Sequence, residues 1–284
     1  MKIFKMSFVR KIRGVLVVLS LFGFVVQSEA TVYTLTHKNS VATFDIGAGP
    51  DSWNAWKING QDQLNNSWFY YRVGGSGPEY PIENLDATPV INQYANLPTF
   101  SRLDLTYANS DYSVRTLYTL TGQVGNKATM GETITVTNSS ASTVVFHLFQ
   151  YNDFDLFGSL VGQSVQYTTN TVNGQYSIAT QTAGGAYIQE RITSASPVIG
   201  HLEAATFSAT LTKLTDGDAD DLNDSTSAGP GNVTFAYQWD VELAPGGTFQ
   251  ISKILEINVP EPSSLALVSL GGFILGWMKR RRMA

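Results

Sequence analysis

The feature that most constrains the fold of this chain is an alternation of apolar and polar residues with a period of two, which recurs through residues 31–259. It is cleanest in residues 101–108, where Leu103, Leu105 and Tyr107 alternate with polar side chains. Because successive side chains of a strand point to opposite faces of a sheet, this pattern predicts strands with one buried face. The 3.6-residue period of an amphipathic helix does not recur, so we predict an all-β fold.

Turn residues separate the alternating segments. Asn59-Gly60 is a strong hairpin signal, because both central residues of such a turn need positive φ, and we expect residues 53–58 and 66–73 to be its strands. About a dozen or more antiparallel strands without a fixed repeat are typical of a single β-sandwich-like domain, and two tightly packed half-domains fit the same pattern. The predicted strands are residues 31–36, 41–46, 53–58, 66–73, 101–108, 112–120, 131–137, 143–151, 165–169, 176–180, 186–193, 233–243 and 249–257.

The first 30 residues have the composition of a secretory signal peptide. Five Lys and Arg residues precede or flank an apolar stretch at residues 14–26, and Ser28 and Ala30 place small residues before a cleavage site. This pattern predicts export through the Sec machinery and removal of residues 1–30 by signal peptidase after Ala30. The alternative is an N-terminal anchor that is not cleaved.

The last 25 residues, 260–284, form a second segment outside the predicted body. Two prolines open it, and because proline fixes φ and lacks a backbone N–H, no strand or helix runs through them. A mostly apolar run at residues 265–278 follows, which predicts a short transmembrane helix, and a basic cluster ends it. Fourteen apolar residues are fewer than the roughly 17 of a short span, which favours a transient anchor over a permanent one. The marked residues are Pro260, Glu261, Pro262, Lys279, Arg280, Arg281 and Arg282.

This tail resembles the PEP-CTERM sorting signal, in which a Pro-Glu-Pro triplet, here Pro260, Glu261 and Pro262, precedes a short membrane segment and an arginine cluster. The resemblance covers about a tenth of the chain. It implies that the chain is a substrate of exosortase, cut near the triplet after transient insertion in the inner membrane. It further implies delivery to the cell envelope, the outer surface or the medium in Gram-negative bacteria that make exopolysaccharide.

Composition excludes several classes of function for the body. Residues 31–259 contain nine basic and 21 acidic residues, a net charge near −12, which disfavours nucleic acid as a partner because no basic patch would release phosphate counterions. The chain has no cysteine, which removes thiol catalysis and cysteine-based metal sites. A body of about 230 residues is long enough to bury a core without disulfides.

An acidic run between residues 216 and 224 is the clearest candidate for a metal site. Its carboxylates alternate, and several carboxylates turned toward one point can hold calcium. The run lacks the glycine and glutamate that the twelve-residue calcium loop requires at its sixth and twelfth positions, so only an irregular site is predicted. The alternative is a solvated surface loop. The candidate calcium ligands are Asp216, Asp218, Asp220 and Asp224.

Two further groups of residues have a chemical and a structural interpretation. Asp153 and Asp155 follow a predicted strand, where they could serve acid–base catalysis in a glycan hydrolase or lyase, or simply form a turn. His147 alternates with apolar residues in that strand. The pattern predicts a histidine on a sheet face with a hydrogen-bond partner, and a ligand or catalytic role is the alternative.

Aromatic side chains concentrate between residues 53 and 71. On the strand at residues 66–73, Trp68 and Tyr70 should share one face, while Phe69 and Tyr71 share the other. Exposed rings could stack on sugars, whereas burial between sheets would leave them structural. The candidate carbohydrate-stacking residues are Trp53, Trp56, Trp68 and Tyr70.

Together these features predict an exported protein with a non-catalytic structural or adhesive role in the exopolysaccharide matrix. Carbohydrate binding is a sub-case of that role. A secreted β-sandwich enzyme acting on glycans is the competing class.

Overall fold

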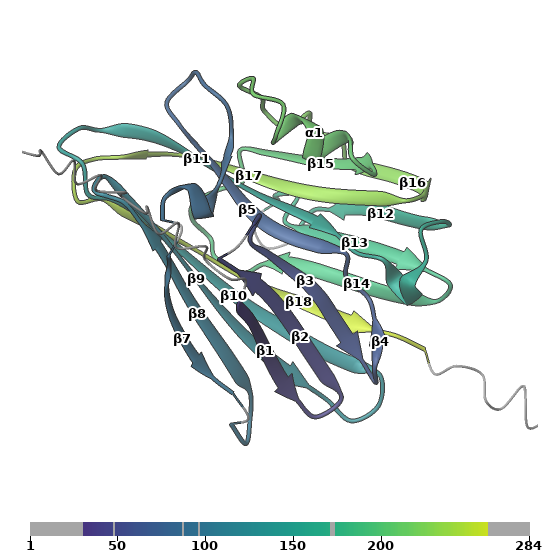
Figure 1. Ribbon diagram of the computed structural model, residues 1–284. Coiled ribbons are helices and arrows are strands. Elements are labelled where there is room, and N and C mark those ends of the chain that lie inside the picture. Colours follow the sequence, from purple (N-terminus) through teal and green to yellow (C-terminus); the bar gives the residue numbers. More distant parts are fainter. Residues whose placement is uncertain (1–30, 48, 87, 96, 171–173, 261–284) are drawn as a thin grey trace, which may run out of the picture.

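The computed structural model describes residues 31–260 except residues 48, 87, 96 and 171–173, and it consists almost entirely of two large antiparallel sheets (Figure 1). The predicted signal peptide with Ala30, the rest of the tail (Glu261, Pro262 and Arg280–Arg282 included) and the predicted short transmembrane helix lie outside the described residues. Within the described part, no helix has the length and apolar character needed to cross a bilayer.

Sheet A has the strand order β1-β2-β3-β5-β11-β17-β15, with β4 paired to β3 and β6 paired to β5. Its strands are β1 (Thr31–His37), β2 (Ser40–Ile46), β3 (Ser52–Ile58), β4 (Gln61–Asp62), β5 (Asn66–Val73), β6 (Tyr80–Pro81), β11 (Val144–Asp153), β15 (His201–Thr206) and β17 (Val233–Leu243).

Sheet B has the order β16-β12-β13-β14-β18-β10-β9-β8-β7. Its strands are β7 (Val90–Tyr94), β8 (Ser101–Ala108), β9 (Tyr112–Gly122), β10 (Lys127–Asn138), β12 (Gln163–Thr168), β13 (Ile178–Ala183), β14 (Ala186–Ile192), β16 (Ser227–Gly231) and β18 (Thr248–Asn258). Short helices η1 (Ile82–Asn84), η2 (Leu156–Gly158) and α1 (Ala209–Lys213) lie in the connections.

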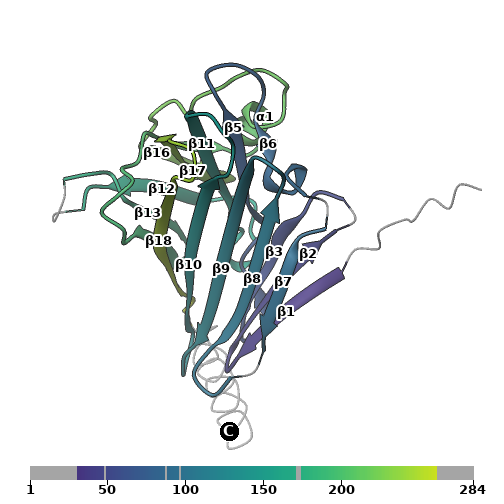
Figure 2. The same cartoon turned by 90° about the vertical axis from the view of Figure 1, so that its left-hand side faces the viewer.

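The core lies between the two sheets, which Figure 2 shows as layers with β7–β10 in front of β1–β3. Aromatic rings join the layers: Phe44 of sheet A packs on Tyr118 of sheet B with 4.7 Å between ring centroids, and Tyr167 of sheet B meets Tyr237 of sheet A at 5.2 Å. These rings are buried, so each contributes a large apolar area to folding. The predicted all-β, antiparallel sandwich is confirmed.

The hairpin prediction was right about the turn and wrong about the partner strand. Asn59 and Gly60 have φ values of 51° and 84°, as the turn requires. The returning strand is the two-residue β4, whereas β5 pairs with β11 along its length and meets β3 only at Trp53 and Ser67. The carboxylate of Asp62 accepts from the backbone N–H groups of Trp56 and Gln63, and β4 ends there.

A buried ionic cluster also connects the sheets. The Lys253 ammonium on β18 lies 2.7 Å from Glu132 on β10 and 2.7 Å from Glu190 on β14. It also contacts the amide oxygen of Gln150, which belongs to β11 of sheet A. All four side chains are buried, and burial raises the pKa of Glu190. Because one cation serves two carboxylates and an amide from three other strands, its position fixes how the sheets sit against each other.

Candidate functional site

The outer face of sheet A collects polar residues from four neighbouring strands. Arg72 on β5 lies opposite His147 on β11, and His147 lies opposite Asp240 on β17. On the far side of β17, His201 of β15 lies opposite Gln238. These positions alternate with core residues such as Phe146 and Trp239, so the strand period turns their side chains away from the core.

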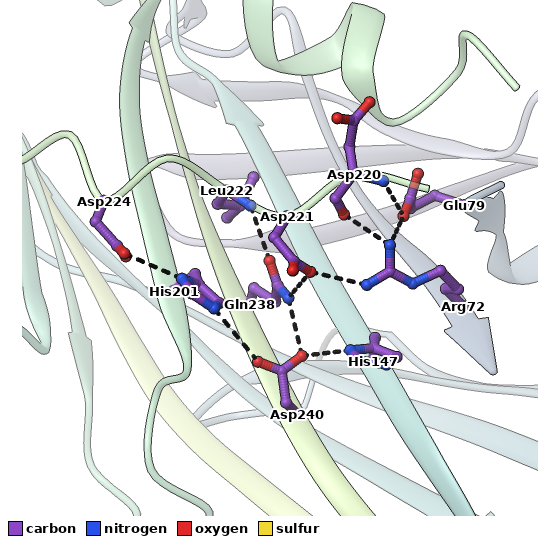
Figure 3. A network of polar contacts seen from close by, with 10 residues as sticks. All are labelled: Arg72, Glu79, His147, His201, Asp220, Asp221, Leu222, Asp224, Gln238 and Asp240. Atoms are coloured by element: carbon purple, nitrogen blue, oxygen red, sulfur yellow. Dashed lines mark hydrogen bonds and ion pairs between the residues drawn. The ribbon is translucent and has the colours of Figure 1, made fainter. Parts of the chain in front are cut away.

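Asp240 is at the centre of these contacts, which we call the histidine network (Figure 3). Its Oδ1 lies 2.5 Å from Nδ1 of His147 and accepts a hydrogen bond of 2.8 Å from the Gln238 amide. Its Oδ2 lies 4.0 Å from Nε2 of His201, whose Nδ1 lies 3.0 Å from a carboxylate oxygen of Asp224. Asp240 thus stands between two imidazoles: Oδ1 is hydrogen-bonded to His147, and a gap of 4.0 Å separates Oδ2 from Nε2 of His201.

The acidic run of residues 216–224 crosses this face and is held there by specific contacts. The Arg72 guanidinium donates to Asp221 and to Glu79, each at 2.8 Å. Gln238 donates to Asp221 at 2.7 Å and accepts from the backbone N–H of Leu222 at 2.9 Å. These bonds make part of the run a fixed wall of the site.

The network keeps its two central carboxylates ionised. Burial alone would raise the pKa of Asp240, but hydrogen bonds from His147 and Gln238 together with the nearby imidazoles outweigh it and lower the pKa. At Asp221 burial is likewise outweighed by hydrogen bonds from Gln238 and Arg72, and the pKa falls. The site therefore presents negative charge and hydrogen-bond acceptors.

A pocket of about 340 Å³ opens beside His201. Tyr176, with 47% of its surface exposed, contributes an aromatic ring to the wall. Gly200 in the wall lies close to the network, since a Cβ there would be 2.2 Å from Oδ2 of Asp240. The lining residues are Gln175, Tyr176, Ile199, Gly200, His201, Leu202, Asp224 and Thr226.

The predicted calcium ligands do not gather at one point in the described structure. Asp216 accepts from the backbone N–H of Asp218, and Asp224 pairs with His201. The group that does bring ligand atoms within 4.8 Å of one another, among described residues, is His147, Asp221 and Asp240. Its histidine is a nitrogen ligand that calcium does not favour, and the Arg72 guanidinium already occupies Asp221.

A second cavity, of about 370 Å³, lies on the same face and is called the aromatic pocket. Trp68 and Tyr70 of β5 contribute to it, as do Asp51, Glu83 and Asn66. Glu83 accepts from the Trp68 indole at 2.7 Å and from the backbone N–H of Asp51 at 3.1 Å. Burial raises the pKa of Glu83 to about 7, and the charge of Asp51 adds to the shift.

The raised pKa of Glu83 predicts a pH-dependent stability. Between its ordinary value of 4.5 and about 7, the folded state holds the proton more tightly than the unfolded chain, so the free energy of unfolding falls as pH rises through this window. At roughly 1.4 kcal/mol per pKa unit the loss is about 3 kcal/mol at most. Glu83→Gln should remove it, so urea titrations at pH 5 and pH 8 should show the variant gaining stability relative to wild type at the higher pH. An identical pH dependence in the two proteins would rule this role out.

The other predicted site residues are dispersed. All four predicted stacking residues are buried: Trp53 and Trp56 completely, and Trp68 and Tyr70 with 1% and 7% of their surface exposed, so the exposed rings that stacking on a sugar requires are not found at these positions. Asp153 is buried and accepts from Asn65, and burial raises its pKa to about 6. Asp155 is bonded to Gln163, and burial also raises its pKa. The expectation for His147 is confirmed, since it lies on the sheet face with Asp240 as its partner.

Sequence reasoning missed Asp240, His201, Arg72 and Glu83. Asp240 is 93 residues from His147 in sequence, and only the placement of β17 between β11 and β15 brings the two histidines to one carboxylate. One signal was available in the sequence, namely polar residues at alternating positions of an otherwise apolar strand. Gln238 and Asp240 are such a pair.

Comparison with known families identifies the tail. Residues 258–282 match the PEP-CTERM protein-sorting motif, which contains Pro260, Glu261, Pro262 and the arginine cluster. The chain carries a PEP-CTERM sorting signal. The motif implies export and processing by exosortase, with a cell-surface or secreted destination. No curated protein matches the chain as a whole.

Solved structures resemble the body in fold, at low sequence identity. A bacterial glucoamylase complexed with acarbose matches with a TM-score of 0.54 and 12% identity, over 86% of this chain and 35% of that one. The Slr1438 protein from Synechocystis sp. PCC 6803 matches at 0.53 and 10%, over 84% and 100%. A putative aldose 1-epimerase from Escherichia coli K12 matches at 0.51 and 12%, over 82% and 100%. This chain therefore spans about a third of the glucoamylase and the full length of the other two.

Proposed function

We propose that the exported body is a non-catalytic carbohydrate-binding protein of the exopolysaccharide matrix, with its sugar site at the histidine network and the pocket beside it. The observation that carries this proposal is the 4.0 Å gap between Oδ2 of Asp240 and Nε2 of His201. The gap is too wide for a direct hydrogen bond, and a sugar hydroxyl, which donates and accepts at once, can bridge it.

The surroundings of the gap support this proposal. Asp240 remains an acceptor because its pKa is lowered, and Asp224 adds a second carboxylate at the pocket wall. Tyr176 supplies an exposed ring against which the apolar face of a sugar can pack. A few convergent polar groups beside an aromatic side chain are typical of small-molecule pockets. The likeness in fold to a glucoamylase and a putative aldose 1-epimerase is consistent with a sugar ligand.

The first test is titration of the full chain with oligosaccharides released from the host exopolysaccharide, followed by calorimetry. Tyr176→Ala should weaken binding by roughly fivefold to tenfold, because about 1 kcal/mol of ring contact is lost. Tyr94→Ala is the matched control: Tyr94 is similarly exposed, at 51%, and lies on β7 of sheet B. Equal affinity of the two variants, or no binding by wild type, would contradict the proposal.

The alternative is a glycan-active enzyme, and one observation favours it. Asp51 and Glu83 line the aromatic pocket together, and a carboxyl group with a pKa of about 7 suits a general acid. This pair replaces Asp153 and Asp155 as the candidate, since neither of those lines the pocket. If the wild-type protein releases reducing ends from the glycan and the variant Glu83→Gln does not, the result would favour an enzyme over a binding protein.

A further inference from the structure

The last strand of the body, β18, ends at one end of the sandwich. The central strand β18 pairs through Asn258 with both β10 and β14, and the backbone N–H of Val259 then donates to Asn126 at 3.0 Å. Val259 is 5% exposed, so the fold holds the chain up to this residue. The sorting motif begins at residue 258, which means that the signal starts where the last strand ends.

Three hairpin tips meet at this place, which we call the exit end. They are residues 38–39 between β1 and β2, residues 59–60 between β3 and β4, and residues 123–126 between β9 and β10. Asn39 donates to the carbonyl oxygen of Gly125 at 2.7 Å, and Asn59 donates to the side-chain oxygen of Asn126 at 2.5 Å. Since Asn126 also accepts from Val259, the tips and the departing chain form one bonded surface.

The exit end carries lysines in a strongly acidic body. Lys38, Lys57 and Lys127 lie in or next to the three tips and are exposed. None of them forms an ion pair with another described residue. Arg102 and Arg191 form none either, whereas Arg72, Arg115, Lys213 and Lys253 do. Val124, at the tip between β9 and β10, is 94% exposed.

The acidic residues nearest to these lysines in strand register accept hydrogen bonds from other groups. Asp62 lies opposite Lys57, but its carboxylate accepts from the backbone N–H groups of Trp56 and Gln63. Glu256, two residues before Asn258, accepts from the Tyr187 hydroxyl at 3.2 Å. Three lysines that form no ion pair with a described residue, together with an exposed valine, therefore lie around the point at which the chain departs.

We propose that the exit end is a membrane-facing surface that docks on anionic lipid headgroups while the sorting tail holds the protein at the inner membrane. The inference rests on the proposed export route, because the tail brings the body to the bilayer. Each lysine near an anionic surface strengthens docking by about fivefold, so the three together contribute roughly 100-fold. Docking in this orientation turns residues 139–143, at the other end of β10, away from the lipid.

The test uses the full chain reconstituted in vesicles of equal parts phosphatidylglycerol and phosphatidylcholine, or of phosphatidylcholine alone. Because the chain has no cysteine, Val124→Cys can carry a single fluorophore, and Ala141→Cys, in the loop after β10, is the control site. Quenching by nitroxide-labelled lipid headgroups should be strong at position 124 in the anionic vesicles and weak at position 141. It should fall in neutral vesicles and in the variant Lys38→Gln, Lys57→Gln, Lys127→Gln.

Flotation of the vesicles distinguishes a failure of lipid docking by the exit end from a failure of the tail to anchor the chain. A chain that floats while position 124 is unquenched, or is quenched equally without the lysines, overturns the lipid-facing surface and leaves the tail anchor intact. A chain that does not float with either vesicle overturns the anchor as well. Quenching that appears only after membrane proteins are added assigns the surface to a protein partner and overturns lipid docking.

Discussion

Replacing Lys253 with methionine is expected to lower the free energy of unfolding by about 3–5 kcal/mol, because the change leaves two buried carboxylates without their cation. Glu132 and Glu190 both lie 2.7 Å from the ammonium, and none of the three side chains reaches solvent. Methionine keeps most of the volume, so the loss reflects charge and not a cavity. Urea unfolding at pH 7 measures it.

The control is the triple variant Lys253→Met, Glu132→Gln, Glu190→Gln. Removing all three charges together avoids the unpaired carboxylates, so the triple variant should recover most of the stability that the single variant loses. A single variant within about 1 kcal/mol of wild type would show that this cluster does not contribute to the fold in the way described.

Replacing Asp240 with asparagine is expected to weaken sugar binding by about 10-fold to 150-fold, the range for a hydrogen bond to a charged group of about 1.5–3 kcal/mol. The substitution removes the negative charge. The amide N–H₂ of the new asparagine must also take the place of one carboxylate oxygen, so it faces either the donors His147 and Gln238 or the gap beside His201. Calorimetry with the oligosaccharide bound by wild type measures the effect.

Asp218→Asn is the matched control for Asp240→Asn, because Asp218 is an exposed aspartate in the acidic run and its side chain takes no part in the histidine network. This variant should bind as wild type does. Equal losses in both variants would attribute the effect to overall charge, and unchanged binding in Asp240→Asn would remove Asp240 from the site.

The periodicity of the sequence was enough to predict the fold class, because alternation states which face of each strand is buried. It placed Trp68 and Tyr70 on one face and Phe69 and Tyr71 on the other, and the structure agrees: Trp68 and Tyr70 line the aromatic pocket, while Tyr71 stacks on Phe146 in the core. The sorting tail could also be predicted from sequence, because its residues are contiguous. The motif match at residues 258–282 confirms that prediction.

The site could not be predicted in the same way, because alternation does not state which strands are neighbours. Asp240 and His201 meet only through the order β11-β17-β15, in which β17 comes late in the chain and lies between earlier strands. The burial of Trp53 and Trp56 depended on the same information, since their rings pack on residues distant in sequence, Tyr118 of sheet B and Phe154.

The most direct test of the carbohydrate site is a crystal structure of the chain soaked with the oligosaccharide that it binds in solution. We expect density for a sugar whose hydroxyl lies between Oδ2 of Asp240 and Nε2 of His201, with a ring face against Tyr176. Density confined to the aromatic pocket beside Glu83, or no sugar at the histidine network at saturating concentration, would contradict this account.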